Sequence, residues 1–425
     1  MTCTQNRIGY PKKLVAFSEK LIGFSEKLVA CSQKRVANLS FSLLKSTSTV
    51  GSTFFLLYIS FYTENLCIFV SSYMLRIRMP SSLSNRHTSS TRFEWVAIAQ
   101  AMAIVLVVMF HVRLLNLDEG SNYEFIDQIC GFLLHIHMPV FFLLSGFLLY
   151  HTRISIGSNP ISVYRNKIIK LGIPFVFCTC LGNLAQIVFN GFVKHPHAVT
   201  PLSFLQSFFI ADGYPWPHRW FLMALILMMV LYPLYKYILK NSIVEIVTLL
   251  LLVGLSYVPF EIKNNLFALI QFKAYLPFFF LGMLVCKYRL WTFLDKLWMP
   301  AALWIVTIII YITPDLWTIV ARHYVIVFKT LCACALISTA LQIAKHHSPA
   351  LSSLSAYIFP IYMFGVAFQA FIELIVWRAI GCPDNLVIIF YILNVIVGIA
   401  LPVLICKLML RLPLRLLHRC LGLSV

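Results

Sequence analysis

A run of apolar residues at 95–115 constrains this chain most, because it is long enough to cross a bilayer as a single helix. About 20 apolar residues span the hydrocarbon core of a membrane. His111 lies about 16 residues into this run, roughly 24 Å from its start at the rise of an α-helix. An ionisable side chain inside a span is costly, so it marks a candidate functional site. We therefore expect the remainder of the chain to be a membrane scaffold built around His111.

Similar apolar runs recur along the chain, and together they predict an all-α fold. Only 12% of the 425 residues are charged and 60% are hydrophobic, whereas a soluble domain carries about 25% charged residues. We predict a polytopic transmembrane helix bundle of about ten spans between residues 92 and 420. The predicted spans are 95–115, 129–150, 169–191, 220–239, 243–260, 266–286, 299–317, 324–344, 355–377 and 386–410.

The loops between these runs alternate in charge, which predicts the orientation of the spans. The loop after the first span is acidic, with Asp118, Glu119, Glu124 and Asp127. Basic residues gather in alternate connections: Arg153, Arg165, Lys167 and Lys170; Lys236 and Lys240; Lys287, Arg289 and Lys296; and Lys345. Because basic loops stay in the cytoplasm, we place both ends of the bundle there and the acidic loop outside.

The same clusters account for the formal net charge of +19. No soluble module with a basic face and stacking aromatic residues accompanies them, so we expect no nucleic-acid partner. The partners that this composition favours are membrane lipid and a small or polymeric substrate. We predict a multi-pass membrane protein.

Residues 1–91 differ from the remainder of the chain. Lys13 to Ser40 contains four seven-residue units, KLVAFSE, KLIGFSE, KLVACSQ and KRVANLS. Their apolar positions are adjacent and form a poor coiled-coil seam. An amphipathic surface helix is one interpretation. The preferred one is an N-terminal extension of duplicated sequence upstream of the true start, with Met74 or Met79 as the initiator.

Polar residues near one end of the early spans are the candidates for chemistry. Gln100 precedes His111 by about three helical turns, roughly 16 Å, so the two share a face of the helix. Neutral imidazole suits proton transfer near pH 7. His137 at the start of the second span is expected at the level of His111, if the two helices are antiparallel neighbours. His218 before the fourth span is expected at the outer mouth, where it could contact a polar substrate. Neighbouring His135 is two residues from His137, a spacing that does not converge on a metal, and no metal is expected.

Three basic residues after the second span form another candidate group: Arg153, Arg165 and Lys167. Ordinary topology signals account for such residues in many membrane proteins. Phosphate groups of an anionic substrate also require them, because arginine binds phosphate through paired donors and lysine binds it as a point charge. Both interpretations stay open on the residues alone.

Several segments, in order, resemble the integral-membrane acyltransferase 3 family. WVAIAQAMAIVLVVMFH is similar to its first-helix motif, HMPVFFLLSGFLL to its second and YRNKIIKLGIPF to its basic third-helix entry. WFLMALILMMVLYPLY, AYLPFFFLGML and LSAYIFPIYMF resemble later segments. The resemblance covers about residues 92–410 and is nearest to the fucose 4-O-acetylase-like, polysaccharide O-acetyltransferase branch.

The resemblance implies transfer of an acyl group, usually acetyl from acetyl-CoA, to a hydroxyl of a cell-envelope sugar or polysaccharide. The family histidine falls on His111, which it makes the catalytic residue. Gln100 would line the route between donor and acceptor. His137 and His218 would lie near the acceptor, and Arg153, Arg165 and Lys167 would attract the phosphates of the donor.

The chain departs from the family pattern at two places. Gln100 replaces a basic residue, and Phe364–Gly365 stands where a histidine is common. Two alternative functions therefore stay open, a glycolipid or polysaccharide transporter and a non-catalytic assembly partner. A transporter favours internal repeats and chains of acidic residues within the spans. Neither pattern is visible between residues 92 and 420.

Overall fold

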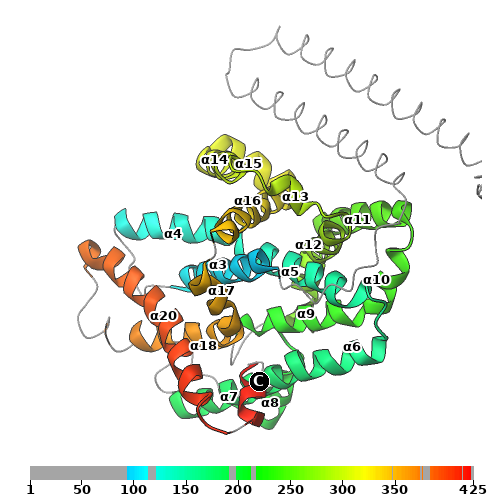
Figure 1. The fold of residues 1–425 in the computed structure, drawn as a ribbon. Coiled ribbons are helices and arrows are strands. Elements are labelled where there is room, and N and C mark those ends of the chain that lie inside the picture. Colours follow the sequence, from blue (N-terminus) through cyan, green and yellow to red (C-terminus); the bar gives the residue numbers. More distant parts are fainter. Residues whose placement is uncertain are drawn as a thin grey trace, which may run out of the picture. The chain divides into compact units, whose positions relative to one another are not determined.

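The computed structural model describes residues 93–112, 121–190, 198–211, 217–346, 348–373, 376, 383–413 and 415–422. The repeats of Lys13 to Ser40 and the whole 1–91 extension lie outside these residues. Helices build the described part (Figure 1). Its only β pairing is a single bridge between Ile210 and Leu266. The predicted all-α polytopic bundle is confirmed.

Among the described residues, seven helical segments are long and apolar enough to cross a membrane. They are α3 (Glu94–His111), Tyr123–Ile154, Pro160–Val188, α12 (Leu269–Tyr288), α16 (Val325–Lys345), Pro349–Ile372 and α20 (Val387–Met409). Three of these segments contain more than one helix. Tyr123–Ile154 contains most of α4 (Ser121–Leu133), α5 (His137–Leu149) and the π-helix η1 (Tyr150–Ile154), and Pro160–Val188 contains α6 (Pro160–Lys167), the π-helix η2 (Ile168–Gly172) and nearly all of α7 (Ile173–Phe189). Pro349–Ile372 contains α17 (Pro349–Leu354), the 3₁₀ helix η5 (Ser355–Tyr357) and α18 (Ile358–Ile372).

Two further predicted spans are bent helix pairs. α9 (Trp220–Val230) and α10 (Tyr232–Ile238) meet at 53°, whereas α14 (Met299–Ile312) and α15 (Pro314–His323) meet at 98°. Counting each pair as one span gives up to nine spans in the described residues. Proline lies in the first turn of α10 and of α15, where its missing N–H and fixed φ favour a new helix start. The predicted spans 220–239 and 299–317 are therefore each divided between two helices.

The predicted span 243–260 is α11 (Ser242–Tyr257), which has only 16 residues. The predicted second span is also interrupted, because a turn at residues 134–136 separates α4 from α5. Pro139 lies in the first turn of α5, where a missing N–H is tolerated. Shorter helices complete the description: α8 (Pro201–Gln206), η3 (Pro217–Arg219), η4 (Lys263–Asn265), α13 (Trp291–Leu294), η7 (Asp384–Leu386) and α21 (Arg415–Cys420).

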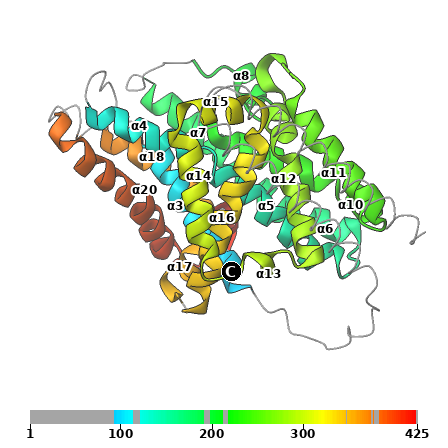
Figure 2. The ribbon, with the colours of Figure 1, turned by 90° about the horizontal axis from the view of Figure 1, so that it is seen from above.

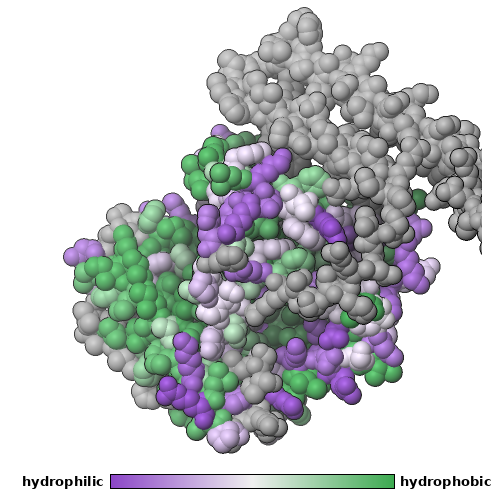
Figure 3. All heavy atoms as spheres, in the orientation of Figure 1, coloured by the Kyte–Doolittle hydropathy of each residue, from purple (hydrophilic) through white to green (hydrophobic). Residues whose placement is uncertain are grey.

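Helix α3 lies in the core of the bundle and packs against α5, α16 and α18 (Figure 2). Its buried residues occur on every side of the helix, as expected of a helix that is surrounded by others. Apolar side chains gather on the surface over α20, as Figure 3 shows. Large exposed residues of that helix are Ile388, Ile389, Ile392, Leu393, Ile396, Leu404 and Leu408. A surface of this kind faces lipid.

Two glycines allow α5 and α12 to approach closely. A Cβ atom added to Gly146 would overlap the backbone carbonyl of Phe279, and one added to Gly282 would overlap that of Leu143. Each glycine thus faces the backbone of the other helix, so a side chain at either position would push α5 and α12 apart. Small residues at such crossings are a common device of membrane helix packing.

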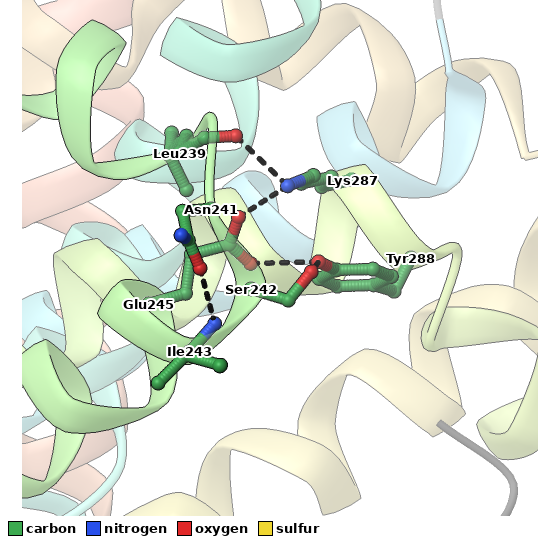
Figure 4. Close-up of polar contacts among 7 residues, drawn as sticks. All are labelled: Leu239, Asn241, Ser242, Ile243, Glu245, Lys287 and Tyr288. Carbon is green, nitrogen blue, oxygen red and sulfur yellow. Dashed lines mark hydrogen bonds and ion pairs between the residues drawn. The ribbon is translucent and has the colours of Figure 1, made fainter. Parts of the chain in front are cut away.

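A buried ion pair joins α11 to the end of α12 (Figure 4). Glu245 is fully buried in the first turn of α11, where the helix dipole favours a negative charge. It pairs with Lys287 and accepts a hydrogen bond of 2.7 Å from the Tyr288 hydroxyl. Lys287 Nζ also donates to the Leu239 carbonyl over 2.9 Å. Three side chains thus fix the junction of α10, α11 and α12.

We expect Gly146→Ala to destabilise the bundle by about 1–3 kcal/mol, because overpacking of a tight contact costs this much. Thermal unfolding of the purified full chain in detergent measures the effect. Gly254→Ala on α11 is the matched control, since an added Cβ there meets no atom within 4 Å. Equal melting temperatures for the two variants would contradict the close α5–α12 contact.

We expect Glu245→Gln to cost about 3 kcal/mol of stability, because it leaves the Lys287 charge without its carboxylate in a largely buried site. Asp295→Asn is the control: it removes the partner of Lys345 in an ion pair of 2.7 Å that is exposed, where such pairs contribute at most about 1 kcal/mol. Chemical denaturation in detergent gives both values. Adding Lys287→Met to Glu245→Gln should recover most of the loss.

Candidate functional site

His111 is the last residue of α3, and its ring orientation is fixed by its own helix. Nδ1 lies 2.8 Å from the Val107 carbonyl. A carbonyl only accepts hydrogen bonds, so Nδ1 carries the proton in the neutral ring. Nε2 is then the basic nitrogen, and it is the atom that can accept a proton from a bound hydroxyl.

Side chains from α18 and α20 hold the last turn of α3. The final carbonyls of a helix have no partner within it. Here Gln369 Nε2 donates to the Val108 carbonyl over 3.0 Å, and the Tyr391 hydroxyl donates to the Met109 carbonyl over 3.1 Å. Gly398 makes room for this arrangement, because a Cβ there would lie 2.9 Å from Gln369 Nε2. The backbone that carries His111 is thus fixed from two neighbouring helices.

Three histidines gather at this end of α3: His111, His137 and His218, which we call the histidine cluster. The His111 and His218 rings are 6.0 Å apart between centroids, and Phe110 lies 5.1 Å from the His137 ring. His137 interacts electrostatically with His111. Its Nδ1 lies 2.6 Å from the Leu133 carbonyl, so its neutral ring has the same tautomer as His111. The rings of the three residues therefore lie together at this end of α3.

His218 is held by contacts to its backbone and to its neighbour. The Tyr362 hydroxyl donates to the His218 carbonyl, and the two rings are 5.6 Å apart. Arg219 is completely buried, and its guanidinium donates to the carbonyls of Ser207 and, over 3.4 Å, of Ile210. These bonds tie η3 to the segment that follows α8.

Burial changes the pKa values of both His218 and Arg219. It lowers the pKa of His218 well below its ordinary value, and the neighbouring His111 lowers it further. Burial also lowers the pKa of Arg219 to about 10, which leaves the guanidinium charged at neutral pH. His218 is thus neutral near pH 7 and can exchange a proton with a partner without carrying a charge beforehand.

Arg153 and Lys167 come together at the opposite end of α5, with Lys170 beside them. Lys167 lies within electrostatic range of both other residues. Arg153 belongs to η1 and Lys170 to η2, and π-helices often mark functional sites. The Tyr232 hydroxyl donates to the carbonyls of Arg153 and Ser158 over 3.3 and 2.9 Å. We call Arg153, Lys167 and Lys170 the basic cluster.

The structure does not bring the basic cluster to the histidine cluster. The chain from His137 to Arg153 is helical, and at about 1.5 Å per residue it covers roughly 24 Å. Arg165 is exposed on α6 beside Lys167. Gln100 is half-buried on α3 between the two levels and belongs to neither cluster. The predicted site residues therefore form two groups at opposite ends of the core, with Gln100 between them.

Sequence reasoning missed two kinds of residue near the histidine cluster. Gln369, Tyr391 and Tyr362 act through contacts that connect distant parts of the chain, so no local pattern could reveal them. Lys329 lies near the start of α16, within electrostatic range of His135 and His137. A lysine a few residues inside an apolar run was a visible signal.

The departure at Phe364–Gly365 has a packing explanation. A Cβ added to Gly365 would lie 2.7 Å from the Gly398 carbonyl, so a larger residue does not fit between α18 and α20. The described residues contain no group of three or more histidine, cysteine, aspartate or glutamate side chains that could hold a metal ion.

These features define a multi-pass membrane protein with a histidine cluster and a basic cluster at opposite ends of its core. The family model described as an acyltransferase domain, Acyl_transf_3, matches residues 93–407. The chain belongs to this family and is a membrane acyltransferase. No curated protein and no solved structure matches it.

If Gln369 positions His111, Gln369→Leu should lower kcat for acyl transfer by roughly tenfold, because the lost hydrogen bond frees the last turn of α3. The KM for the acyl donor should stay constant. Gln342→Leu on α16 is the control, since it removes two exposed side-chain contacts, to Asp295 over 3.3 Å and from Lys345 over 3.1 Å, and neither reaches α3. A parallel loss of folded protein with unchanged kcat per folded molecule would assign Gln369 a purely structural role.

Proposed function

We propose that this protein transfers an acetyl group from acetyl-CoA to a hydroxyl of a cell-envelope sugar or polysaccharide, as in the fucose 4-O-acetylase-like branch of the family. One observation carries the proposal. His111 ends a buried helix with its Nδ1 committed to the Val107 carbonyl, so its Nε2 is oriented as a base next to His218. The proposed location is the bacterial inner membrane.

The basic cluster supports a donor site at the cytoplasmic end of the core. Coenzyme A carries phosphate groups, and the donor supplies an activated thioester when it is bound. Arg153 can bind a phosphate through paired N–H donors, while Lys167 and Lys170 add positive charge. Arg165 is exposed on the same helix as Lys167 and would attract the donor from solution.

Gln100 supports a route between the two ends. It can hydrogen-bond to an amide or hydroxyl of a long donor but offers no charge. Recognition of the donor phosphates is therefore assigned to Arg153 and Lys167, while Gln100 lines the passage toward His111. The separation of about 24 Å between the clusters requires an extended donor.

The proposed chemistry is general-base catalysis at the histidine cluster. His111 Nε2 removes the proton of the acceptor hydroxyl as its oxygen attacks the acyl carbon. The carbon–oxygen bond of the new ester forms and the thioester carbon–sulfur bond breaks, and the proton held on His111 is returned to the leaving sulfur or to water. Neutral His218 and His137 would position the acceptor. General-base assistance contributes about 10²–10⁴-fold to the rate.

We expect His111→Ala to lower the rate of acetyl transfer by about 10²–10⁴-fold, because it removes the base. Release of free CoA thiol by the purified full chain, with an envelope glycan fraction as acceptor, measures the rate. His346→Ala is the matched control, since His346 is exposed at the far end of α16 and should leave the rate unchanged.

A complementation test addresses the cellular role. Envelope polysaccharide acetylation is compared in a deletion strain that carries wild type, His111→Ala or Gln100→Arg. Loss of acetylation with His111→Ala alone supports the proposal. Equal rescue by all three would mean that the chain serves assembly and not transfer.

A further inference from the structure

Lys329 is a half-buried lysine of α16 without a negatively charged partner. The described ion pairs are Lys287–Glu245 and Lys345–Asp295, and no described carboxylate lies at ion-pair distance from Lys329. Its Nζ lies 5.7 Å from the centre of the Tyr275 ring. A charged group inside a membrane bundle is costly unless it is paired. Among the described residues, Lys329 therefore has no carboxylate partner, whereas Lys287 and Lys345 each have one.

The described surroundings of Lys329 do not balance its charge. The residue lies in the second turn of α16, near the end of the helix where the dipole disfavours a cation. His135 and His137, from the turn before α5 and from α5 itself, lie within electrostatic range. The Tyr275 ring of α12 stacks on Phe142, at 4.8 Å, and on Trp220, at 5.6 Å, and these contacts hold the ring beneath the ammonium group in place.

His135 is a second polar group without a partner on the same side of the core. Its Nδ1 is buried and makes no hydrogen bond. The ring packs 5.0 Å from Trp317 of α15 and 5.6 Å from Phe328, the neighbour of Lys329. Helix α15 thus lies over His135. One element thus contributes a lysine that no described carboxylate pairs with, and another contributes a buried nitrogen without a hydrogen bond. A ligand can complete both.

We propose that Lys329 and His135 bind an anionic group of the acceptor, a carboxylate or a phosphate on a sugar, so that the substrate is an acidic glycan. This inference rests on the proposed function. His137 lies within electrostatic range of both Lys329 and His111, so an anion held here would bring a neighbouring hydroxyl close to the base. The donor phosphates have their own basic cluster at the other end of α5, which leaves this site to the acceptor.

Binding is tested on the full-length protein in nanodiscs of neutral lipid. The probes are glucuronic acid for the carboxylate, glucose 1-phosphate for the phosphate and glucose as the neutral reference, each measured by calorimetry or by thermal protection. We expect one or both anionic sugars to bind roughly tenfold more tightly than glucose, since a charge-assisted hydrogen bond contributes about that factor. The probe that binds more tightly identifies the anion.

Lys329→Met should abolish the preference for the anionic sugar, and Lys329→Arg should retain it. Lys345→Met on the same helix is the control and should bind like wild type, because Lys345 is in an exposed ion pair. Equal binding of all three sugars to wild type, or an undiminished preference in folded Lys329→Met, overturns the inference. Because no acyl transfer is measured, this result is independent of the His111→Ala assay.

Discussion

The site depends on how the last turn of α3 is held in place. A helix that ends inside a protein leaves carbonyl groups that water cannot reach. Gln369 and Tyr391 satisfy those of Val108 and Met109 from α18 and α20, and the His111 ring uses that of Val107. The same hydrogen bonds that remove the cost of a buried helix end also orient the imidazole. Stability and orientation of the proposed base are thus coupled.

Much of the fold could be predicted from the sequence, because apolar length alone identifies a membrane helix. All ten predicted runs form helices among the described residues. The bends could not be predicted in the same way: hydropathy continues through Pro314, yet α14 and α15 meet at 98°. Local composition predicts that a segment lies in an apolar medium. The direction of a helix after a proline depends instead on its tertiary neighbours, which local composition does not reveal.

The site was predictable only where a costly residue stood out against apolar sequence. His111, His137 and His218 were visible for this reason, and the level shared by His111 and His137 followed from the antiparallel order of their two spans. Gln369 and Tyr391 were not visible, because they contact residues 261 and 282 positions away. Lys329 was visible as a charge, but its proposed role required the finding that no carboxylate among the described residues pairs with it.

The contrast between Lys287 and Lys329 shows how this bundle separates structural from functional charge. Lys287 has Glu245 and a backbone carbonyl as partners, so its charge is compensated within the fold. Among the described residues, Lys329 has only an aromatic ring and two histidines near it, and the proposed anion of the acceptor would balance its charge. Natural structures leave few buried polar groups unsatisfied. The pairing of Lys287 is therefore a structural feature of the bundle, whereas the charge of Lys329 beside the histidine cluster is available to the proposed ligand.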